Sequence, residues 1–469
     1  MTDDFDHANF GNKRLDARAL KIAQALACKP EQTLPEVFDH DQELENAYDF
    51  FGHDWLSFDH LTQPHFEGTA RRAALIEGDL SVLHDTTKYN FLIHHDLREN
   101  LSRFSKTRQG FFGHGSLVVA TADVPAPLGY IAYQPFVHIN DIPDASTRAF
   151  WEKLDGVMDN ESVRWMRGVE QAAERLGDKQ RLVHVFDIEG DSYEILHQLK
   201  EGSHRYVYRL GQKRLVSTPE EAGLLKKVMF KAEVLTTYQV WVSERKPANP
   251  RTLPKSRKPE RRPRFATMEV RACKVAFIRP DKVPKSAPAT IKVNVVYVRE
   301  AAPPEGEEPV EWCLATSEAI QTPEDVHRVI ERYKERWLIE ESNKSIKTGC
   351  GYSKRQLRSA TSLLNLLALT LPVSLDLLRF RYLSRAVPDW PATAVVTARQ
   401  LQILQAVVKK VKWSKEPTVH EATYAVAKLG GFLKHNKVPG WQTISRGYQT
   451  LLEYEIGWVA GQRTTKPPD

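Results

Sequence analysis

Three acidic residues of the 469-residue chain stand where secondary structure could gather oxygen ligands. Asp85 follows the strand-like run of residues 80–84, Asp187 follows the run of residues 181–186, and Glu340 lies on a predicted helix. Strands deliver the side chains at their ends to the edge of a sheet, so neighbouring strands would bring the two aspartates together. Two aspartates and a glutamate match the ligands of a pair of hard divalent cations, which can activate water or a hydroxyl for phosphoryl transfer.

The helix that carries Glu340 has a well-defined predicted start, because Thr322 can cap it and Pro323 suits its first turn. Its apolar stripe continues into Arg336 and Glu340, so the buried face becomes charged partway along. A carboxylate on such a stripe is unfavourable unless it is paired or bound to metal, and the neighbouring cations could neutralise it or hold phosphates. Alternatively, the helix emerges into solvent there and its charges form surface pairs.

Each aspartate also has a simpler interpretation. Asp85 and the segment that begins at Asp187 could each start a turn or cap a helix, because aspartate side chains bond readily to nearby backbone. The flanking His84 and His184 should point to the opposite strand face, where we expect them to be core or second-sheet residues. No thiol or histidine cluster in the sequence competes for a metal ion.

Composition limits the class of protein. The net charge of +6 favours polyanionic partners only weakly. The N-terminus lacks the pattern of an export signal, and residues 363–378 are apolar but interrupted by polar residues, as in a buried helix. We therefore expect a cytoplasmic protein with no membrane role. No disulfide framework or zinc site is expected from the widely spaced cysteines: Cys28, Cys273, Cys313 and Cys350.

The periodicity predicts an α/β protein with helical flanks. Helices are predicted at residues 12–28, 42–51 and 60–72, and together they suggest a small helical domain. Strand-like runs at 80–84, 115–121, 128–136 and 181–186 surround a helical pattern at 144–176, which indicates a mixed sheet. More strand-like runs, at 204–210, 266–277, 291–300 and 312–316, lie between Asp187 and the glutamate helix. The chain is predicted to be helical from about residue 357.

A basic loop is predicted within the β-rich part. Residues 245–264 contain nine basic residues, five prolines and a single acid, a composition that cannot pack as a core element. The loop could follow DNA phosphates or could be a solvated linker, and we favour a role in DNA binding.

The motifs together resemble a known family. Tyr333, Arg336, Glu340 and Lys347 stand at the spacing Y-x2-R-x3-E-x6-K, and the segments around Asp85 and Asp187 are similar to the two aspartate motifs that accompany it. This pattern resembles the bacterial insertion-sequence transposases with a DDE triad. The similarity is greatest to the cut-and-paste branch whose composite transposon carries kanamycin resistance and excises through DNA hairpins.

The resemblance implies an RNase H-like catalytic core with a β-rich insertion, flanked by helical N- and C-terminal domains. Residues 1–70 would bind the transposon end, residues 71–375 would form the catalytic domain with its insertion at about 204–318, and residues 376–469 would dimerise. Asp85, Asp187 and Glu340 would hold two Mg²⁺ or Mn²⁺ ions per active site. The expected partners are transposon-end DNA, target DNA and a second protomer in the synaptic complex.

The resemblance also implies an order of steps: 3′ nicking, hairpin formation and resolution, and strand transfer. In the family the signature Tyr, Arg and Lys contact phosphates, and the tryptophan matching Trp312 receives a flipped base, although a core aromatic is an alternative. The candidate DNA contacts are Tyr333, Arg336, Lys344, Lys347, Trp312, Trp337, Arg209, Lys213, Arg14 and Arg18. Two rival functions remain open: an inactive end-binding inhibitor of transposition, and a nuclease of RNase H fold without end recognition.

Overall fold

The computed structural model describes residues 4–5, 8–53, 55–93, 97–121, 124–158, 162–211, 213–245, 260–433 and 439–464. The chain divides into two compact units. The first unit comprises Met1–Gly177 together with Trp337–Asp469, and the second comprises Asp178–Arg336. The mixture of helices with parallel and antiparallel strands confirms the predicted α/β class.

The first unit begins with a group of helices. Asn12 caps the first of them by accepting a hydrogen bond from the backbone N–H of Arg14. The helices predicted at 12–28, 42–51 and 60–72 are confirmed with their ends shifted by no more than two residues, whereas one short helix was not predicted. These helices are α1 (Lys13–Cys28), α2 (Leu34–Val37), α3 (Asp41–Phe51) and α4 (Phe58–Ala74).

A mainly antiparallel sheet follows in the first unit, in the order β5-β4-β3-β1, and β2 also pairs with β3. The strands are β1 (Leu80–Leu92), β2 (Ser102–Ser105), β3 (Arg108–Ala120), β4 (Ala126–His138) and β5 (Val157–Met158). Helix α6 (Ser162–Leu176) packs closely on this sheet at Gly168, where an added Cβ would lie 2.8 Å from the Ser116 hydroxyl. Strand β5 runs parallel to β4.

The single helical pattern predicted at 144–176 is wrong. The segment forms two helices, α5 (Ala145–Lys153) and α6, with β5 between them. Asp155 adopts a φ of 50°, which a right-handed helix does not contain, so the chain turns there. Periodicity alone does not register this turn because apolar residues continue on both sides of it.

The core of the first unit contains the long helix α11 (Ala360–Ala386). Its most apolar stretch is long enough to cross a membrane, but 83% of that stretch is buried inside the protein, as the sequence predicted for residues 363–378. Asn365 is buried on this helix and donates to the backbone carbonyl of Phe51. The helix therefore packs as a core element, and one of its polar residues is satisfied by α3.

Further helices follow α11 and share a small apolar cluster of their own. They are α12 (Ala398–Val407), α13 (Val419–Leu429) and α14 (Trp441–Thr464). Phe380 of α11, Leu404 of α12, Val426 of α13 and Leu451 of α14 are all buried in this cluster. The prediction of a helical C-terminal part is confirmed for the residues described.

A buried acid ties the N-terminal residues to the first unit. Asp4 lies 2.7 Å from the Nδ1 atom of His65 and 2.6 Å from a guanidinium nitrogen of Arg72. The backbone N–H of Tyr130 donates to His65 Nε2, so the proton of the neutral imidazole lies on Nδ1 and is donated to Asp4. The N-terminal segment, α4 and β4 are thereby linked by one hydrogen-bond chain.

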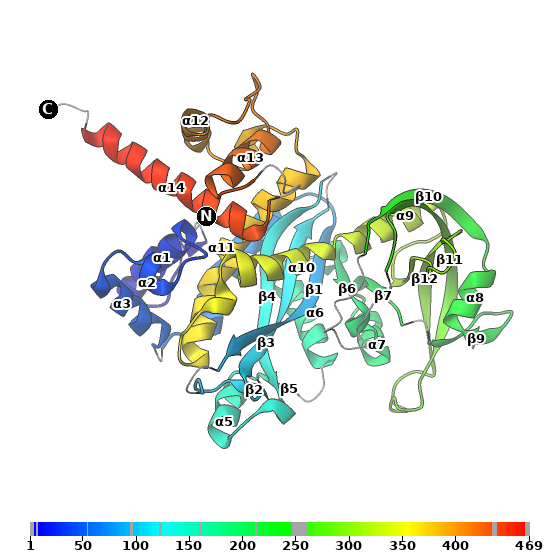
Figure 1. Ribbon diagram of the computed structural model, residues 1–469. Coiled ribbons are helices and arrows are strands. Elements are labelled where there is room, and N and C mark those ends of the chain that lie inside the picture. The colour runs from blue at the N-terminus through cyan, green and yellow to red at the C-terminus, as the bar shows by residue number, and fades with distance from the viewer. Residues whose placement is uncertain are drawn as a thin grey trace. The chain divides into compact units, whose positions relative to one another are not determined.

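The second unit contains a parallel pair of strands joined by a helix, followed by antiparallel strands (Figure 1). Its strand order is β6-β7-β13-β12-β11-β8-β9, and β10 also pairs with β11. The strands are β6 (Leu182–Phe186), β7 (Arg205–Arg209), β8 (Leu215–Ser217), β9 (Ala222–Leu224), β10 (Val234–Val242), β11 (Arg264–Ile278), β12 (Thr290–Glu300) and β13 (Glu311–Thr316). The helices are α7 (Tyr193–Glu201), α8 (Leu225–Lys231) and α9 (Pro323–Lys334).

Most strands of the second unit agree with the predicted runs, but β8, β9, β10 and α8 were not predicted. The predicted basic loop at 245–264 lies largely outside the described residues, which omit 246–259.

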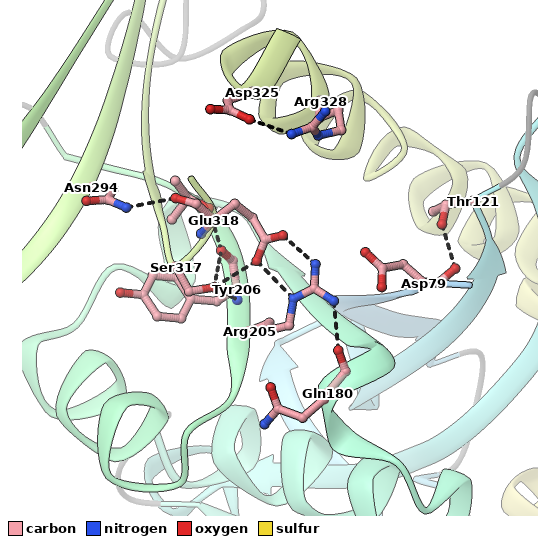
Figure 2. Close-up of polar contacts among 11 residues, drawn as sticks. Asp79, Thr121, Gln180, Arg205, Tyr206, Asn294, Ser317, Glu318, Asp325 and Arg328 are labelled. Atoms are coloured by element: carbon pink, nitrogen blue, oxygen red, sulfur yellow. Dashed lines mark hydrogen bonds and ion pairs between the residues drawn. The ribbon is translucent and has the colours of Figure 1, made fainter. Parts of the chain in front are cut away.

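A polar network fixes the strand ends of the second unit (Figure 2). The guanidinium of Arg205 donates to both carboxylate oxygens of Glu318, at 3.1 and 2.5 Å, and to the backbone carbonyl of Gln180. Asn294 donates to the Glu318 carbonyl at 2.7 Å. Paired charges in this geometry hold β7, β12 and the segment after β13 in register.

Candidate active site

Asp85 lies inside a strand rather than at its end, which corrects the predicted position. Strand β1 continues for seven residues beyond it to Leu92 and stays paired with β3 throughout. Asp85 is half-buried, and its Oδ2 atom accepts a hydrogen bond of 2.9 Å from the Asn343 side chain. Residues after Asp85 are more polar than those of a typical strand, so the predicted end of the strand was too early. The turn interpretation of Asp85 is also wrong.

Lys347 contacts the same face of β1. Its ammonium donates to the Thr87 hydroxyl at 2.5 Å and lies 5.5 Å from the centre of the Tyr89 ring. Burial lowers the pKa of Lys347, whereas the charge of Asp85 opposes that shift. Because alternate strand residues share a face, Asp85, Thr87 and Tyr89 present one surface to this lysine.

The opposite face of β1 carries the predicted core histidine. His84 is fully buried, and its Nδ1 atom lies 3.0 Å from the Ser116 hydroxyl. Burial lowers its pKa well below the ordinary value, so the ring is neutral near pH 7. His184 of the second unit is buried as well, which confirms the expectation for both histidines.

Glu340 lies in the first turn of α10 (Trp337–Lys344) and is half-buried. Helix α10 contacts β1 and crosses in front of it in Figure 1. The π-helical turn η6 (Ser345–Gly349) follows directly and carries Lys347. Glu340, Asn343 and Lys347 therefore follow one another at intervals of about one turn, on the segment that packs against β1.

The prediction of one helix that begins after Thr322 and continues through Arg336 and Glu340 is wrong. Thr322 caps α9, as expected, and Asp325 completes a capping box with it, but the helix ends at Lys334 and α10 begins at Trp337. The backbone N–H of Arg336 bonds to the carbonyl three residues earlier, in the tighter geometry of a helix end. This break of two residues hardly changes the spacing of the charged residues in the sequence, but it separates Arg336 from the helix that carries Glu340.

Asp187 directly follows β6 and caps the short helical turn η4 (Ile188–Gly190). Its Oδ1 atom accepts a hydrogen bond of 2.8 Å from the backbone N–H of Glu189. The capping interpretation of this residue is therefore confirmed. A cap uses one carboxylate oxygen and does not conflict with a ligand role, and the side chain is half-buried.

Four of the candidate DNA contacts gather in the second unit. The ring centres of Trp312 and Tyr333 are 6.1 Å apart, and the Arg336 guanidinium lies 6.0 Å from the Tyr333 ring. Burial raises the pKa of Tyr333, while the nearby charges of Arg336 and Arg209 lower it and that of Asp187 raises it. One aromatic pair, two cations and the strand-end carboxylate are thus neighbours in this unit.

The remaining candidate contacts are more dispersed. Lys213 and Arg14 are exposed, and Arg18 is half-buried on α1. Lys344 lies 4.5 Å from the Trp337 ring and pairs with Glu341 at 2.9 Å. The structure therefore gives Lys344 a local partner, in contrast to the contact of Lys347 with β1.

The three acids of the predicted triad are divided between the units. Asp85 and Glu340 belong to the first unit and Asp187 to the second. Within the described ranges, no cluster of three or more His, Cys, Asp or Glu side chains is arranged to hold a metal ion. The predicted two-metal site thus stays a prediction, supported in each unit by carboxylates that are partly accessible.

Two residues of this site were missed from the sequence. Asn343 and Thr87 contact Asp85 and Lys347 across 258 and 260 positions of the chain. The available signal was the position of Asn343 one turn from both Glu340 and Lys347, within an otherwise helical segment. Spacing could mark it as a neighbour but could not assign its partner.

The N-terminal helices have a recognisable counterpart among known proteins. Residues 1–56, which include α1 to α3, match the family model described as transposase DNA-binding. The cations Arg14 and Arg18 of α1 lie within the matched segment. The match supports a transposase that binds DNA through this N-terminal segment.

Proposed function

We propose that this protein is a DNA transposase that carries out cut-and-paste transposition with divalent cations bound by Asp85, Asp187 and Glu340. The observation that carries the proposal is the match of residues 1–56 to a transposase DNA-binding family model. After that segment, the chain carries two half-buried carboxylates, one inside β1 and one at the end of β6. DNA binding and phosphoryl transfer are the two properties that a transposase requires.

The donor set fits magnesium or manganese. All three candidate ligands are carboxylates, and their oxygens are the ligands that these hard cations prefer. The imidazole of His84, the residue before Asp85, points to the other face of β1 and is bonded to Ser116, so it does not alter this preference. When bound, two such cations would activate the attacking oxygen and stabilise the leaving oxygen at phosphorus.

The protein side chains would bind and orient DNA around this chemistry. Lys347 and Arg336 supply positive charge for phosphates, and Asn343 holds the Asp85 carboxylate in one orientation. Trp312 is half-buried beside Tyr333 and would stack on a base. Positioning of this kind lowers the barrier because the reacting atoms are held in line.

The proposed reaction consists of successive displacements at phosphorus. Water attacks a phosphodiester at the transposon end, the bond to the 3′ oxygen breaks, and that oxygen takes up a proton. The freed 3′ hydroxyl then attacks the opposite strand to form a hairpin, and a second water reopens it. Finally the 3′ hydroxyls attack target DNA. Each step exchanges one P–O bond for another, so one site can serve all of them.

The synaptic complex would be a homodimer formed by the C-terminal helices. Helix α14 exposes Tyr454 and Trp458, one turn apart on one face, which are 45% and 40% accessible. Apolar surface of this kind favours burial against another protein. A partner protomer would bury it and bring two transposon ends together.

Cleavage of a transposon end tests the proposal. A short duplex carrying the inverted-repeat end of the element is incubated with Mg²⁺ and either wild-type protein or Asp187→Ala, and the strands are resolved on denaturing gels. Nicks and hairpins that require both the wild-type residue and Mg²⁺ are expected. Binding of the duplex by both proteins without any cleavage would replace this proposal with an inhibitor of transposition.

A binding assay separates the remaining rival. Wild-type protein is compared on the inverted-repeat duplex and on a scrambled duplex of the same length, with Arg14→Ala/Arg18→Ala as the matched variant. The proposed function requires a preference for the end that the variant loses. Cleavage without any sequence preference would indicate a simple nuclease.

A further inference from the structure

Strands β10 and β11 form an antiparallel ribbon whose register extends beyond the strands themselves. Trp241 lies opposite Phe265, and the same register reaches Arg245 opposite Arg261. The two arginines exchange backbone hydrogen bonds of 2.8 and 3.0 Å. Among the described strands, β10 pairs only with β11, so this ribbon lies at an edge of the sheet.

One face of the ribbon gathers two aromatic rings and two arginines. Successive side chains alternate between faces, so Trp241, Arg245, Arg261 and Phe265, all at odd positions in one register, share a face. We call these four residues the aromatic ribbon face. Residues of the opposite face are buried in the second unit: Val242, Ala266 and Met268.

The two rings are unusually accessible for large aromatic side chains. Trp241 is 55% exposed and Phe265 is 73% exposed, and their ring centres are 4.9 Å apart at an interplanar angle of 62°. Helix α8 covers the far end of the same face, where the Phe230 ring lies 5.5 Å from Arg271. The protein thus covers one end of this face and leaves the aromatic pair accessible.

The charge on this face is poorly balanced. Burial lowers the pKa of Arg261, and the neighbouring charges of Arg245 and Arg264 lower it further, against the opposing effect of Glu300 and Glu307. Arg264, which points to the opposite face, is by contrast bonded to both glutamates at 2.6 Å. A bound polyanion would relieve the repulsion between Arg245 and Arg261.

We propose that the aromatic ribbon face binds DNA with unpaired bases, with Trp241 and Phe265 stacking on bases and Arg245 and Arg261 contacting phosphates. Aromatic side chains bind single strands because every base has an accessible π-face once it is unstacked. An intact duplex hides those faces and offers only phosphates. The inference rests on the proposed function in taking DNA as the partner, but it assigns residues other than the three acids.

The test measures binding of the full chain to one sequence in two forms. A labelled single strand of about 16 nucleotides and its blunt duplex are titrated by fluorescence anisotropy. Trp241→Ala/Phe265→Ala is expected to weaken single-strand binding about 10- to 100-fold and to leave duplex binding nearly unchanged. Trp241→Phe/Phe265→Tyr should keep the preference for the single strand, since it keeps two rings.

Matched variants make each outcome decisive. Trp390→Ala removes an exposed tryptophan of the first unit, 47% accessible, and should change neither affinity. Arg245→Gln/Arg261→Gln should weaken the binding of both the single strand and the duplex, and should reduce the dependence of affinity on salt concentration. Equal loss on both ligands in the aromatic double variant, or no preference for the single strand in wild type, would overturn the proposal. If the alanine variant unfolds, Trp241→Leu/Phe265→Leu replaces it under the same criterion, because it removes both rings and keeps apolar side chains of similar bulk.

This outcome is independent of the catalytic proposal. Cleavage of the inverted-repeat duplex by the same preparations reports on Asp85, Asp187 and Glu340. If wild-type protein did not cleave but still preferred the single strand, only the proposed transposase activity would be refuted. If wild-type protein cleaved but did not prefer the single strand, only the proposed binding site on the aromatic ribbon face would be refuted.

Discussion

The two aspartates that look equivalent in the sequence are held in different ways. Asp187 is fixed locally, because it caps the turn that directly follows its strand and bonds to a backbone N–H two residues later. Asp85 is fixed from a distance, because it lies inside β1 and is held by Asn343, 258 residues further along the chain. A carboxylate with a local cap keeps its position as long as its own loop folds. The position of a carboxylate held by a distant amide depends instead on how α10, which carries that amide, packs against β1.

This difference suggests separate roles for stability and chemistry at the two positions. Loss of an N-cap costs about 0.5–2 kcal/mol, and asparagine caps nearly as well as aspartate. Loss of the Asn343 contact would leave the backbone of β1 paired with β3 along its full length. Substitutions can therefore be chosen that remove the charge, the cap or the distant contact one at a time.

The largest effect is expected from removal of either charge. Asp85→Asn and Asp187→Asn should each lower end cleavage on the order of 10³-fold, because each removes a carboxylate ligand of the proposed cations, which supply the electrostatic stabilisation at the reacting phosphate. Asp187→Ala should lower cleavage by the same factor and should also lower the melting temperature. Asp187→Asn should retain the wild-type melting temperature, because asparagine can still cap the turn. Cleavage rates and thermal unfolding of all three variants provide the check. Full activity in either asparagine variant would exclude that aspartate from the catalytic site.

A smaller effect is expected when the distant contact is removed. Asn343→Ala should lower cleavage about 10- to 100-fold and raise the Mg²⁺ concentration that half-saturates the rate, since residues behind metal ligands typically contribute that much. The matched control is Asn294→Ala, which removes an amide that bonds to the Glu318 carbonyl in the second unit. If Asn343→Ala cleaved at the wild-type Mg²⁺ dependence, Asp85 would be as locally determined as Asp187.

Lys347 tests whether the β1 face binds phosphate. Lys347→Met should reduce the slope of log affinity against log salt by about one for the end duplex. Because burial lowers the pKa of this lysine, wild-type affinity should begin to fall at a pH below the ordinary lysine value of 10.5. Lys344→Met is the matched control, since that ammonium already pairs with Glu341. If the slope of log affinity against log salt were the same for both variants and wild type, neither lysine would contact DNA phosphates.

The sequence predicted those elements whose signals are local. Thr322 caps a helix where expected, the first helix begins within one residue of its predicted start, and His84 is buried on the predicted face. The end of β1 was misjudged because its later residues are polar and are covered by partners such as Lys347, which no short window of sequence contains. The helix break before Trp337 was missed because a two-residue turn barely disturbs the spacing of the charges.

The same division applies to the candidate site. Residue types and spacing were sufficient to select Asp85, Asp187 and Glu340, because metal chemistry restricts the ligands to a few kinds of side chain. Asn343 could not be selected in this way. An amide has no restricted chemistry, and its importance arises only from its hydrogen bond to Asp85.

A second pair of acids extends the comparison to pH, with the smallest expected effect. Burial would raise the pKa of Asp4, but bonds to His65 and Arg72 lower it overall, whereas burial raises the pKa of Asp376 to about 6. Asp4 therefore adds stability that is present above pH 3.8 and lost in acid, while ionised Asp376 removes stability as the pH rises from 3.8 to about 6.

Substitution of the two acids should accordingly have opposite signs. At pH 7.5, Asp4→Asn should lower the melting temperature by a few degrees, because it loses the charged partner of Arg72, and Asp376→Asn should raise it by a similar amount. Both differences should shrink as the pH falls towards 4, where wild-type Asp376 is protonated and Asp4 begins to lose its advantage. Melting curves across this range measure them. Shifts of the same sign in both variants would mean that burial, rather than the partners of each carboxylate, determines its contribution to stability.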